Sequence, residues 1–181
     1  MKKLLMILAV VTFTLQVKAQ FTKAVLQATG LTCAMCNNAI NKALQQVPFV
    51  ESVQSDIKNS AFHIVFRQNA DVDIDALKNA VEDAGFSVGS LKLTGMFSEI
   101  KIANEKHVQI NDKQFCFLNV SGQTLDGEKT ITVVDKDFMT AKEFKKISSS
   151  TKMSCLQTGK PASCCNSDGA LANSRVYHVT I

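Results

Sequence analysis

The sequence predicts an α+β protein, with a regular unit of strands and helices followed by a smaller part rich in strands. The chain has 181 residues, enough for one large domain or two small ones. Apolar residues make up 46% of it, an ordinary share for a globular protein with a packed core. We expect three segments: a signal peptide at 1–19, a first domain at 20–94 and a small β-rich domain at 95–181.

The first 19 residues have the three parts of a secretory signal. Met1-Lys2-Lys3 is basic, Leu4 to Leu15 is nearly unbroken apolar sequence, and Val17-Lys18-Ala19 is a small-x-small cleavage site. This apolar run is shorter than the roughly 20 residues that a membrane-spanning helix needs. We therefore expect cleavage before Gln20, export to the periplasm and no stable membrane insertion, with an uncleaved anchor as the alternative.

Charge gives little indication of a nucleic-acid partner. Removal of the signal takes away three lysines, so the formal net charge falls from +4 to +1. The mature chain has no basic run with interleaved aromatic residues, the pattern that usually marks binding to nucleic acid. We expect no nucleic-acid partner.

The first domain has apolar patterns of both strand and helix type. In the first expected helix, Ala39, Ile40, Ala43, Leu44 and Val47 form one stripe, and a proline follows directly. The expected elements are strands at 21–28, 50–57, 61–67 and 86–93, a helix at 35–46 and a second helix after Asp71 and Asp73. Their order is βαββαβ, which is the ferredoxin-like motif.

The second domain is predicted less completely. Strands are expected at 97–103, 107–120, 129–135 and 175–181, with turns at Asn111-Asp112 and Asp126-Gly127. A helix is expected at 140–147, starting with a capping box of Thr140 and Glu143, and residues 148–174 have loop composition. By topology alone, this order suggests a small open barrel of the OB type.

Cys33 and Cys36, in the stretch Gly30-Leu31-Thr32-Cys33-Ala34-Met35-Cys36, are the candidate metal ligands. Sulfur donors select soft ions such as Cu(I), Zn(II) or Hg(II). Zinc prefers four ligands, whereas Cu(I) and Hg(II) are satisfied by two thiolates, so the ligand count favours these two ions. A helix N-terminus at Cys36 also favours the thiolate and lowers the pKa expected for this residue.

The GLTCAMC stretch after a first strand, within βαββαβ, resembles the heavy-metal-associated domain family. That family includes copper chaperones, the N-terminal modules of copper-exporting ATPases and the periplasmic mercury-binding protein. Its usual motif is GMTCxxC, and Leu31 replaces a methionine that packs beneath the loop. Gly85-Phe86 matches the Gly-aromatic pair close to the metal loop. The resemblance covers residues 21–94 and implies that Cys33 and Cys36 bind the ion.

We therefore expect an exported protein that holds a soft ion for transfer or sequestration and is not an enzyme. Cu(I) is the expected ion, with Hg(II) and Zn(II) as alternatives. The expected acceptor is a metal-transporting ATPase or another protein with thiolate ligands. No catalytic constellation is recognisable in the sequence.

Two other interpretations of the cysteine pair stay open. The pair could rest as a disulfide in an oxidising compartment, or act in an extracytoplasmic thiol–disulfide redox protein. A thioredoxin-type site usually has an aromatic residue where this chain has Thr32, and a cis-proline beside it, whereas Pro48 and Pro161 lie elsewhere. Met35 is expected to fill the loop or pack on the helix rather than bind the ion.

Four further cysteines belong to the second domain. They are Cys116, Cys155, Cys164 and Cys165. In an oxidising compartment we expect disulfides among them, and the alternative is a soft-metal site that includes Met153. Cys116 alternates with two phenylalanines in a strand, so it is either buried core or a bridge partner.

The three histidines stand in strand-like segments. His63, His107 and His178 have no second histidine or acidic residue at ligand spacing. We therefore expect each of them to be an ordinary strand residue rather than a ligand.

Overall fold

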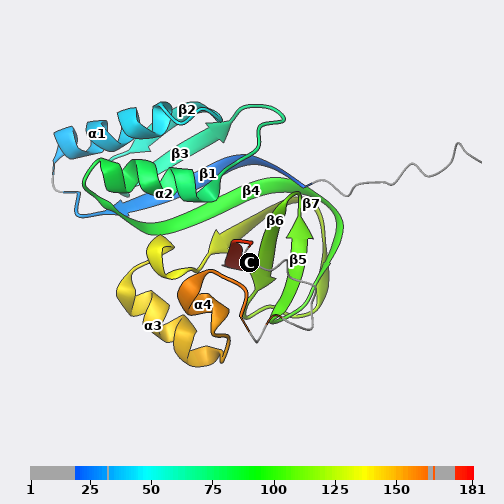
Figure 1. Cartoon of the computed structure of the whole chain (residues 1–181). Helices are drawn as coiled ribbons and strands as arrows, with labels where there is room; N and C mark the ends of the chain where they lie inside the picture. The colour runs from blue at the N-terminus through cyan, green and yellow to red at the C-terminus, as the bar shows by residue number, and fades with distance from the viewer. Residues whose placement is uncertain (1–18, 32, 163–164, 166–173) are drawn as a thin grey trace, which may run out of the picture.

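The computed structural model describes residues 19–31, 33–162, 165 and 174–181. The expected signal peptide lies outside these ranges except for Ala19, and so do Thr32 and Cys164. Within these ranges, no helix combines the length and apolar character needed to cross a membrane. The described residues form an α+β fold around a mixed sheet of eight strands (Figure 1).

The N-terminal half has the six expected elements in the expected order. They are β1 (Gln20–Thr29), α1 (Ala34–Gln45), β2 (Val50–Asp56), β3 (Ala61–Phe66), α2 (Ile74–Asp83) and β4 (Ser87–Ile102). Strand β1 lies between β3 and β4 and is antiparallel to both, while β2 pairs with the far edge of β3. The ferredoxin-like fold of this half is confirmed.

Helices α1 and α2 lie side by side over the strands of this half (Figure 1). Ile40 and Leu44 of α1, and Leu77 and Val81 of α2, are completely buried. The spacing of four residues places each pair on one side of its helix, where it meets the strands. Asp73 caps α2, because its carboxylate accepts two backbone N–H groups of the first turn at 3.0 and 3.2 Å.

Strand β4 differs from the expectation, because it continues well beyond Leu93 and ends only at Ile102. Its first part pairs with β1, and much of its length also pairs with β7 (Gln123–Val133). The domain boundary expected between residues 94 and 95 therefore lies inside a continuous strand. In a lone ferredoxin-like unit β4 would be an edge strand with unpaired backbone groups, and β7 provides their partners.

The described residues of the C-terminal half add four strands and three short helical segments. Besides β7, they are β5 (Lys106–Ile110), β6 (Lys113–Phe117), η1 (Lys136–Phe138), α3 (Ala141–Ser150), α4 (Cys155–Thr158) and β8 (Val176–Thr180). The strand order is β2-β3-β1-β4-β7-β8-β6-β5, with β6 and β8 parallel. The expected OB-type barrel is therefore corrected, because these strands extend the sheet from β4 and leave β5 at an open edge.

Some local features of this half agree with the prediction and others differ from it. The turn at Asn111-Asp112 joins β5 to β6, and Thr140 and Glu143 form the expected capping box of α3. Asp126-Gly127 is not a turn but lies within β7, where Gly127 has φ of 72° beside a bulge in β4. The stretch expected as loop contains α4 and the end of α3.

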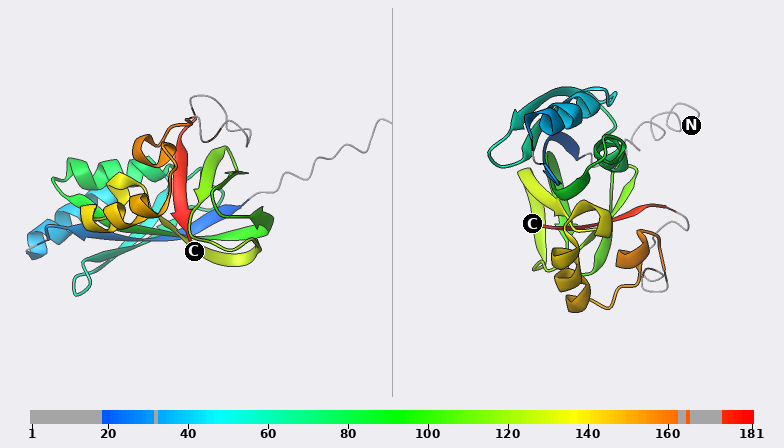
Figure 2. Two further views of the ribbon diagram at one scale, coloured as in Figure 1. Left: turned by 90° about the horizontal axis from the view of Figure 1, so that it is seen from below. Right: turned by 90° about the vertical axis from the view of Figure 1, so that its left-hand side faces the viewer.

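Strands β6 and β8 are buried on both faces. Phe115, Phe117, Tyr177 and Val179 join the main core. The alternate residues join a second apolar cluster with α3 and α4, made of Cys116, Leu118, Val134, Phe144, Met153, Cys155, Leu156, Cys165 and Val176. In the right view of Figure 2, α3 and α4 lie on the opposite side of the molecule from α1. Cys116 is therefore buried core, one of the two roles expected for it.

A polar network around Arg175 connects the start of β8 to α2. Nε of Arg175 donates to Asp75 at 3.1 Å, and Nη2 donates to the buried Asp135 at 2.9 Å. The Tyr177 hydroxyl donates to the same Asp75 carboxylate at 3.0 Å, and the guanidinium carbon lies 4.5 Å from the Tyr177 ring centroid. A helix of the N-terminal half is therefore held to the last strand of the chain.

We predict that Tyr177 ionises at higher pH than an ordinary tyrosine. Burial raises the pKa of its hydroxyl, and the Asp75 carboxylate raises it further, outweighing the opposite effect of Arg175. A pKa above the unfolded value of 10.0 contributes stability that is fully present below this value and is lost as the pH rises beyond it.

The chain has one tyrosine, so the near-ultraviolet absorbance of tyrosinate reports on Tyr177 alone. We expect its midpoint to lie above pH 10 in the native protein and to return to about 10 in denaturant. Equal midpoints in the two states would contradict the burial of this hydroxyl against Asp75.

Candidate metal site at the start of the first helix

The loop between β1 and α1 carries the two expected ligands. After Thr29 the chain turns at Gly30, whose φ of 82° is a left-handed value that glycine adopts without strain. Cys33 follows as the extended N-cap residue of α1, and Cys36 is the third residue of the helix. The first cysteine is thus on the loop and the second on the opening turn, as the spacing predicts.

The sulfur of Cys33 is directed at the helix N-terminus. Its Sγ accepts the backbone N–H of Cys36 at 3.3 Å, the position that a serine or aspartate oxygen usually takes in a capped helix. The first turn of α1 contains no acidic residue, so no carboxylate in this turn opposes a thiolate. The helix dipole favours negative charge at the same place.

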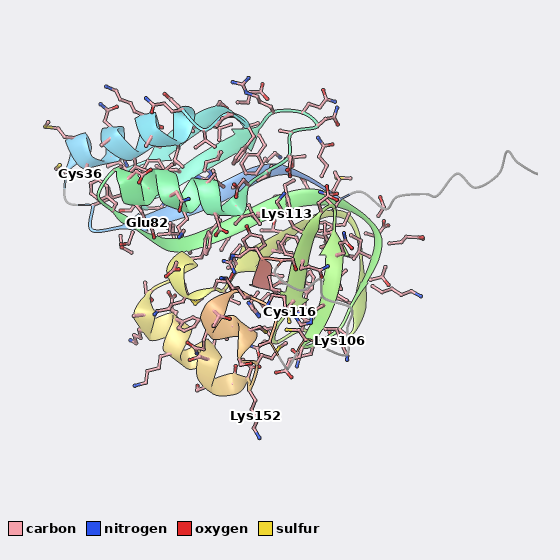
Figure 3. The ribbon with its side chains drawn as sticks, viewed as in Figure 1. Cys36, Glu82, Lys106, Lys113, Cys116 and Lys152 are labelled. Atoms are coloured by element: carbon pink, nitrogen blue, oxygen red, sulfur yellow. The ribbon has the colours of Figure 1, made fainter. Side chains whose placement is uncertain are left out.

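The pair is at the outer end of the N-terminal half, where Figure 3 labels Cys36. Cys33 is exposed and has a free thiol, so it forms no disulfide in this structure, while Cys36 is half-buried. Met35 is 83% exposed and therefore does not pack on the helix. A ligand of the pair would be within reach of a thiolate from another protein.

Apolar residues support the loop from below. Leu31 and Phe86 are partly buried against the main core. Thr29 pairs with Ser87 at the end of β1, which places Gly85-Phe86 beside the cysteine loop. Leu31 thus packs onto the core next to the loop, the position expected for the residue that replaces the methionine of the usual motif.

The cysteine loop does not line the cavity that lies at the other end of β1. That cavity has a volume of about 590 Å³ and lies at the start of β1, where Phe21, Val72 and Lys113 contribute to its lining. The cysteines follow the other end of the same strand. The arrangement at Cys33 and Cys36 therefore suits capture of a small ion at the surface rather than enclosure of an organic ligand.

Two histidines have partners that the sequence analysis did not predict. His178 Nδ1 lies 2.7 Å from Asp135 Oδ1, and its Nε2 lies 3.2 Å from Cys155 Sγ. The ligand atoms of His107, Cys155 and Cys165 all lie within 4.8 Å of one another. These contacts were not expected from the sequence, but they do not contradict the prediction that His107 and His178 are strand residues rather than ligands, since both lie in strands.

The missed partners are far apart in sequence and meet only through strand pairing and the position of α4. Ligand spacing along the chain could not have found them. His63, by contrast, is exposed on β3. Cys116, Cys155 and Cys165 are not bonded to one another, and Cys164 lies outside the described residues.

Comparison with known proteins finds relatives of the N-terminal half. The model of the heavy-metal-associated domain matches residues 25–87. The copper chaperone CopZ of Staphylococcus haemolyticus is 30% identical over 64 residues, which are 35% of this chain and 93% of the chaperone. The chain belongs to the heavy-metal-associated domain family. Cys33, Cys36 and the Gly85-Phe86 pair all lie within the matched range.

Larger relatives in this family share only one part with the chain. The probable copper-transporting ATPase HMA5 of Arabidopsis thaliana is 26% identical over 113 residues, which are 62% of this chain but 10% of the ATPase. The chain thus matches about a tenth of that protein's length. A solved structure of a CopZ metallochaperone is 25% identical, covers 37% of this chain and 98% of its own, and has a TM-score of 0.34.

Proposed function

We propose that this protein is an exported carrier that holds Cu(I) between Cys33 and Cys36 and passes it to another protein by thiolate exchange. The observation that carries the proposal is the pair itself: two cysteines at an exposed helix N-terminus, one of them capping the helix through its sulfur. Two thiolates complete the coordination of Cu(I) but not that of Zn(II).

Transfer requires that the ion be held and still be accessible. Cys33 is exposed, so an incoming thiolate could bind the ion before Cys33 or Cys36 releases it. The named relatives support copper, since they are described as copper chaperones and copper-transporting ATPases. A domain of such an ATPase, or another protein with a cysteine pair, is the acceptor that this chemistry fits.

We predict that replacing both cysteines by serine removes one high-affinity Cu(I) equivalent. The hydroxyl of serine is a hard donor and does not replace a thiolate for a soft ion. The measurement is a titration of the reduced protein under anaerobic conditions against a chromophoric Cu(I) chelator. A double variant C33S/C36S that competes for copper as wild type does would refute the proposal.

Met35→Ala is the matched control, because this side chain lies in the same loop and is 83% exposed. We expect it to leave the Cu(I) affinity unchanged within about threefold, since a solvated thioether outside the coordination sphere contributes little. The same titration, followed by mixing of the loaded protein with a CxxC domain of a copper-transporting ATPase, measures transfer directly.

A redox role for the same cysteines predicts a different result. A thiol–disulfide oxidoreductase would reduce insulin disulfides in turnovers that depend on Cys33, and its pair would cycle between dithiol and disulfide. A carrier without enzymatic activity would show no such turnover and would bind copper instead. The two assays together therefore distinguish the roles.

A further inference from the structure

Three adjacent strands of the C-terminal half place chemically reactive side chains in one row. His107 of β5 is the register partner of Cys116 in β6, and Cys116 is the register partner of His178 in β8. Residues opposite one another in neighbouring strands project from the same face of a sheet. The row faces the apolar cluster under α3 and α4, and Figure 3 shows Cys116 between the strands and α4.

Two more cysteines approach the row from the segment that covers it. Cys155 is the first residue of α4, Cys165 follows that helix, and both are completely or almost completely buried. Their Sγ atoms and a ring nitrogen of His107 all lie within 4.8 Å of one another. His107 is half-buried on β5, at the edge of the sheet, which leaves one side of the group close to solvent.

A second ring orients one of these sulfurs. His178 is completely buried, with Nε2 at 3.2 Å from Cys155 Sγ and Nδ1 at 2.7 Å from the carboxylate of Asp135. Asp135 thereby fixes the imidazole, and the imidazole in turn fixes the sulfur. The order Asp-His-Cys is also that of a nucleophilic triad, but Cys155 and His178 have no exposed surface on which a substrate could act.

We propose that His107, Cys155 and Cys165 form a second metal site, buried in the C-terminal half, which binds Cu(I) through two thiolates and one imidazole. His178 and Asp135 position Cys155 and are not ligands. Each cysteine loses its thiol proton when it binds as thiolate, so binding releases protons to solvent. The site uses none of the residues of the exposed pair at Cys33 and Cys36.

The geometry fits an ion after a small contraction. Three donors within 4.8 Å of one another leave a central ion at most about 2.8 Å from each, against bond lengths of about 2.0–2.3 Å for nitrogen and sulfur ligands. A shift of about half an ångström per ligand therefore closes the site. Three donors complete a trigonal set for Cu(I), whereas Zn(II) would need a fourth ligand.

The test titrates Cu(I) into the reduced full chain under anaerobic conditions. Wild type is expected to bind two equivalents, and C33S/C36S is expected to keep one. Adding C155S and C165S to C33S/C36S is expected to remove that remaining equivalent. The proposal is overturned if C33S/C36S binds no copper, or if the fourfold variant still binds one equivalent.

Cys116→Ala in the C33S/C36S background is the matched control, because Cys116 is equally buried and lies in the same row. It contacts Met153 through its sulfur at 3.6 Å, and we expect it to keep the copper equivalent. Complete loss in this variant would overturn the assigned set of three ligands.

A second measurement does not depend on the folding of variants that carry C155S and C165S. X-ray absorption of copper-loaded C33S/C36S is expected to show two sulfur donors and one imidazole, and His107→Ala should remove the imidazole and weaken binding at least tenfold. An unchanged imidazole signal in that variant would overturn the proposal. A Cys155–Cys165 disulfide in copper-free protein isolated from cells would overturn it as well.

The outcomes separate this proposal from the proposed function. If the exposed pair binds no copper while C33S/C36S still binds one equivalent, the carrier proposal fails and the buried site stands. If wild type binds one equivalent and C33S/C36S binds none, the buried site fails alone.

Discussion

Replacing Arg175 by alanine is expected to lower the free energy of unfolding by about 3 kcal/mol. The guanidinium lies between Asp75 of α2 and Asp135, and the Asp135 side chain is only 5% exposed. Without Arg175, the negative charge of Asp135 stays buried with His178 as its remaining partner. A buried charge that loses its counter-ion costs far more than a surface ion pair, because water cannot replace the partner.

The expected value lies at the lower end of the range for buried pairs because of solvent screening. Arg175 is itself about a third exposed, so solvent screens part of its interaction. Burial alone would lower the pKa of Arg175, but Asp135 and Asp75 outweigh this effect and raise it. The guanidinium therefore stays charged across the range in which proteins are stable.

The measurement is urea unfolding followed by circular dichroism. Lys23→Ala is the matched control, since Lys23 and Glu128 form an ion pair in which both side chains are more than half exposed. We expect that change to cost less than about 1 kcal/mol. Arg175→Met keeps most of the packing volume, so a loss equal to that of alanine would assign the effect to charge. A loss under 1 kcal/mol in both Arg175 variants would contradict the bridging role.

Much of the N-terminal half could be predicted because its signals are local. The stripe on α1, the acidic cap at Asp73 and the left-handed glycine at Gly85 each depend on residues a few positions apart. The same holds for the cysteine pair, whose sulfur–amide contact spans three residues. Short-range patterns of this kind are determined by backbone geometry and do not require knowledge of the rest of the fold.

The course of β4 could not be predicted in this way. Gly95 is the first residue of the second domain expected from the sequence, and glycine often marks a break between elements. In the structure it lies inside β4, where a Cβ would come within 2.7 Å of the Gln20 carbonyl oxygen in β1, so the close approach of the two strands requires glycine. A glycine required by close approach of two strands looks the same in sequence as one that ends a strand.

The buried group at His107, Cys155 and Cys165 was missed for a related reason. These residues are separated by 48 and 10 positions, and β5, α4 and the segment after it bring them together. Ligand spacing along the chain singles out Cys155 and Cys165 but not His107, which is far from both in sequence. The composition of the segment suggested loop, whereas Cys155 and Leu156 are completely or almost completely buried.

Replacing Phe97 by alanine is expected to destabilise both halves of the protein together, by about 3–5 kcal/mol. Phe97 lies on the second part of β4 and is 2% exposed. Its ring centroid is 6.1 Å from that of Phe21 on β1, which in turn is 6.0 Å from that of Phe115 on β6. The three rings connect the ferredoxin-like half to the C-terminal strands, so a cavity at Phe97 weakens the packing of both.

Hydrogen exchange of β3 measures whether the halves are coupled, because β3 belongs to the N-terminal half and pairs with β1 and β2. In a coupled protein Phe97→Ala speeds exchange in β3 as well as in β6, since both open in the same global unfolding. Met96→Ala is the control, because Met96 precedes Phe97 on the same strand and is 50% exposed on the opposite face, so little change is expected. Faster exchange in β6 with unchanged exchange in β3 would show instead that the two halves unfold independently despite the continuous strand.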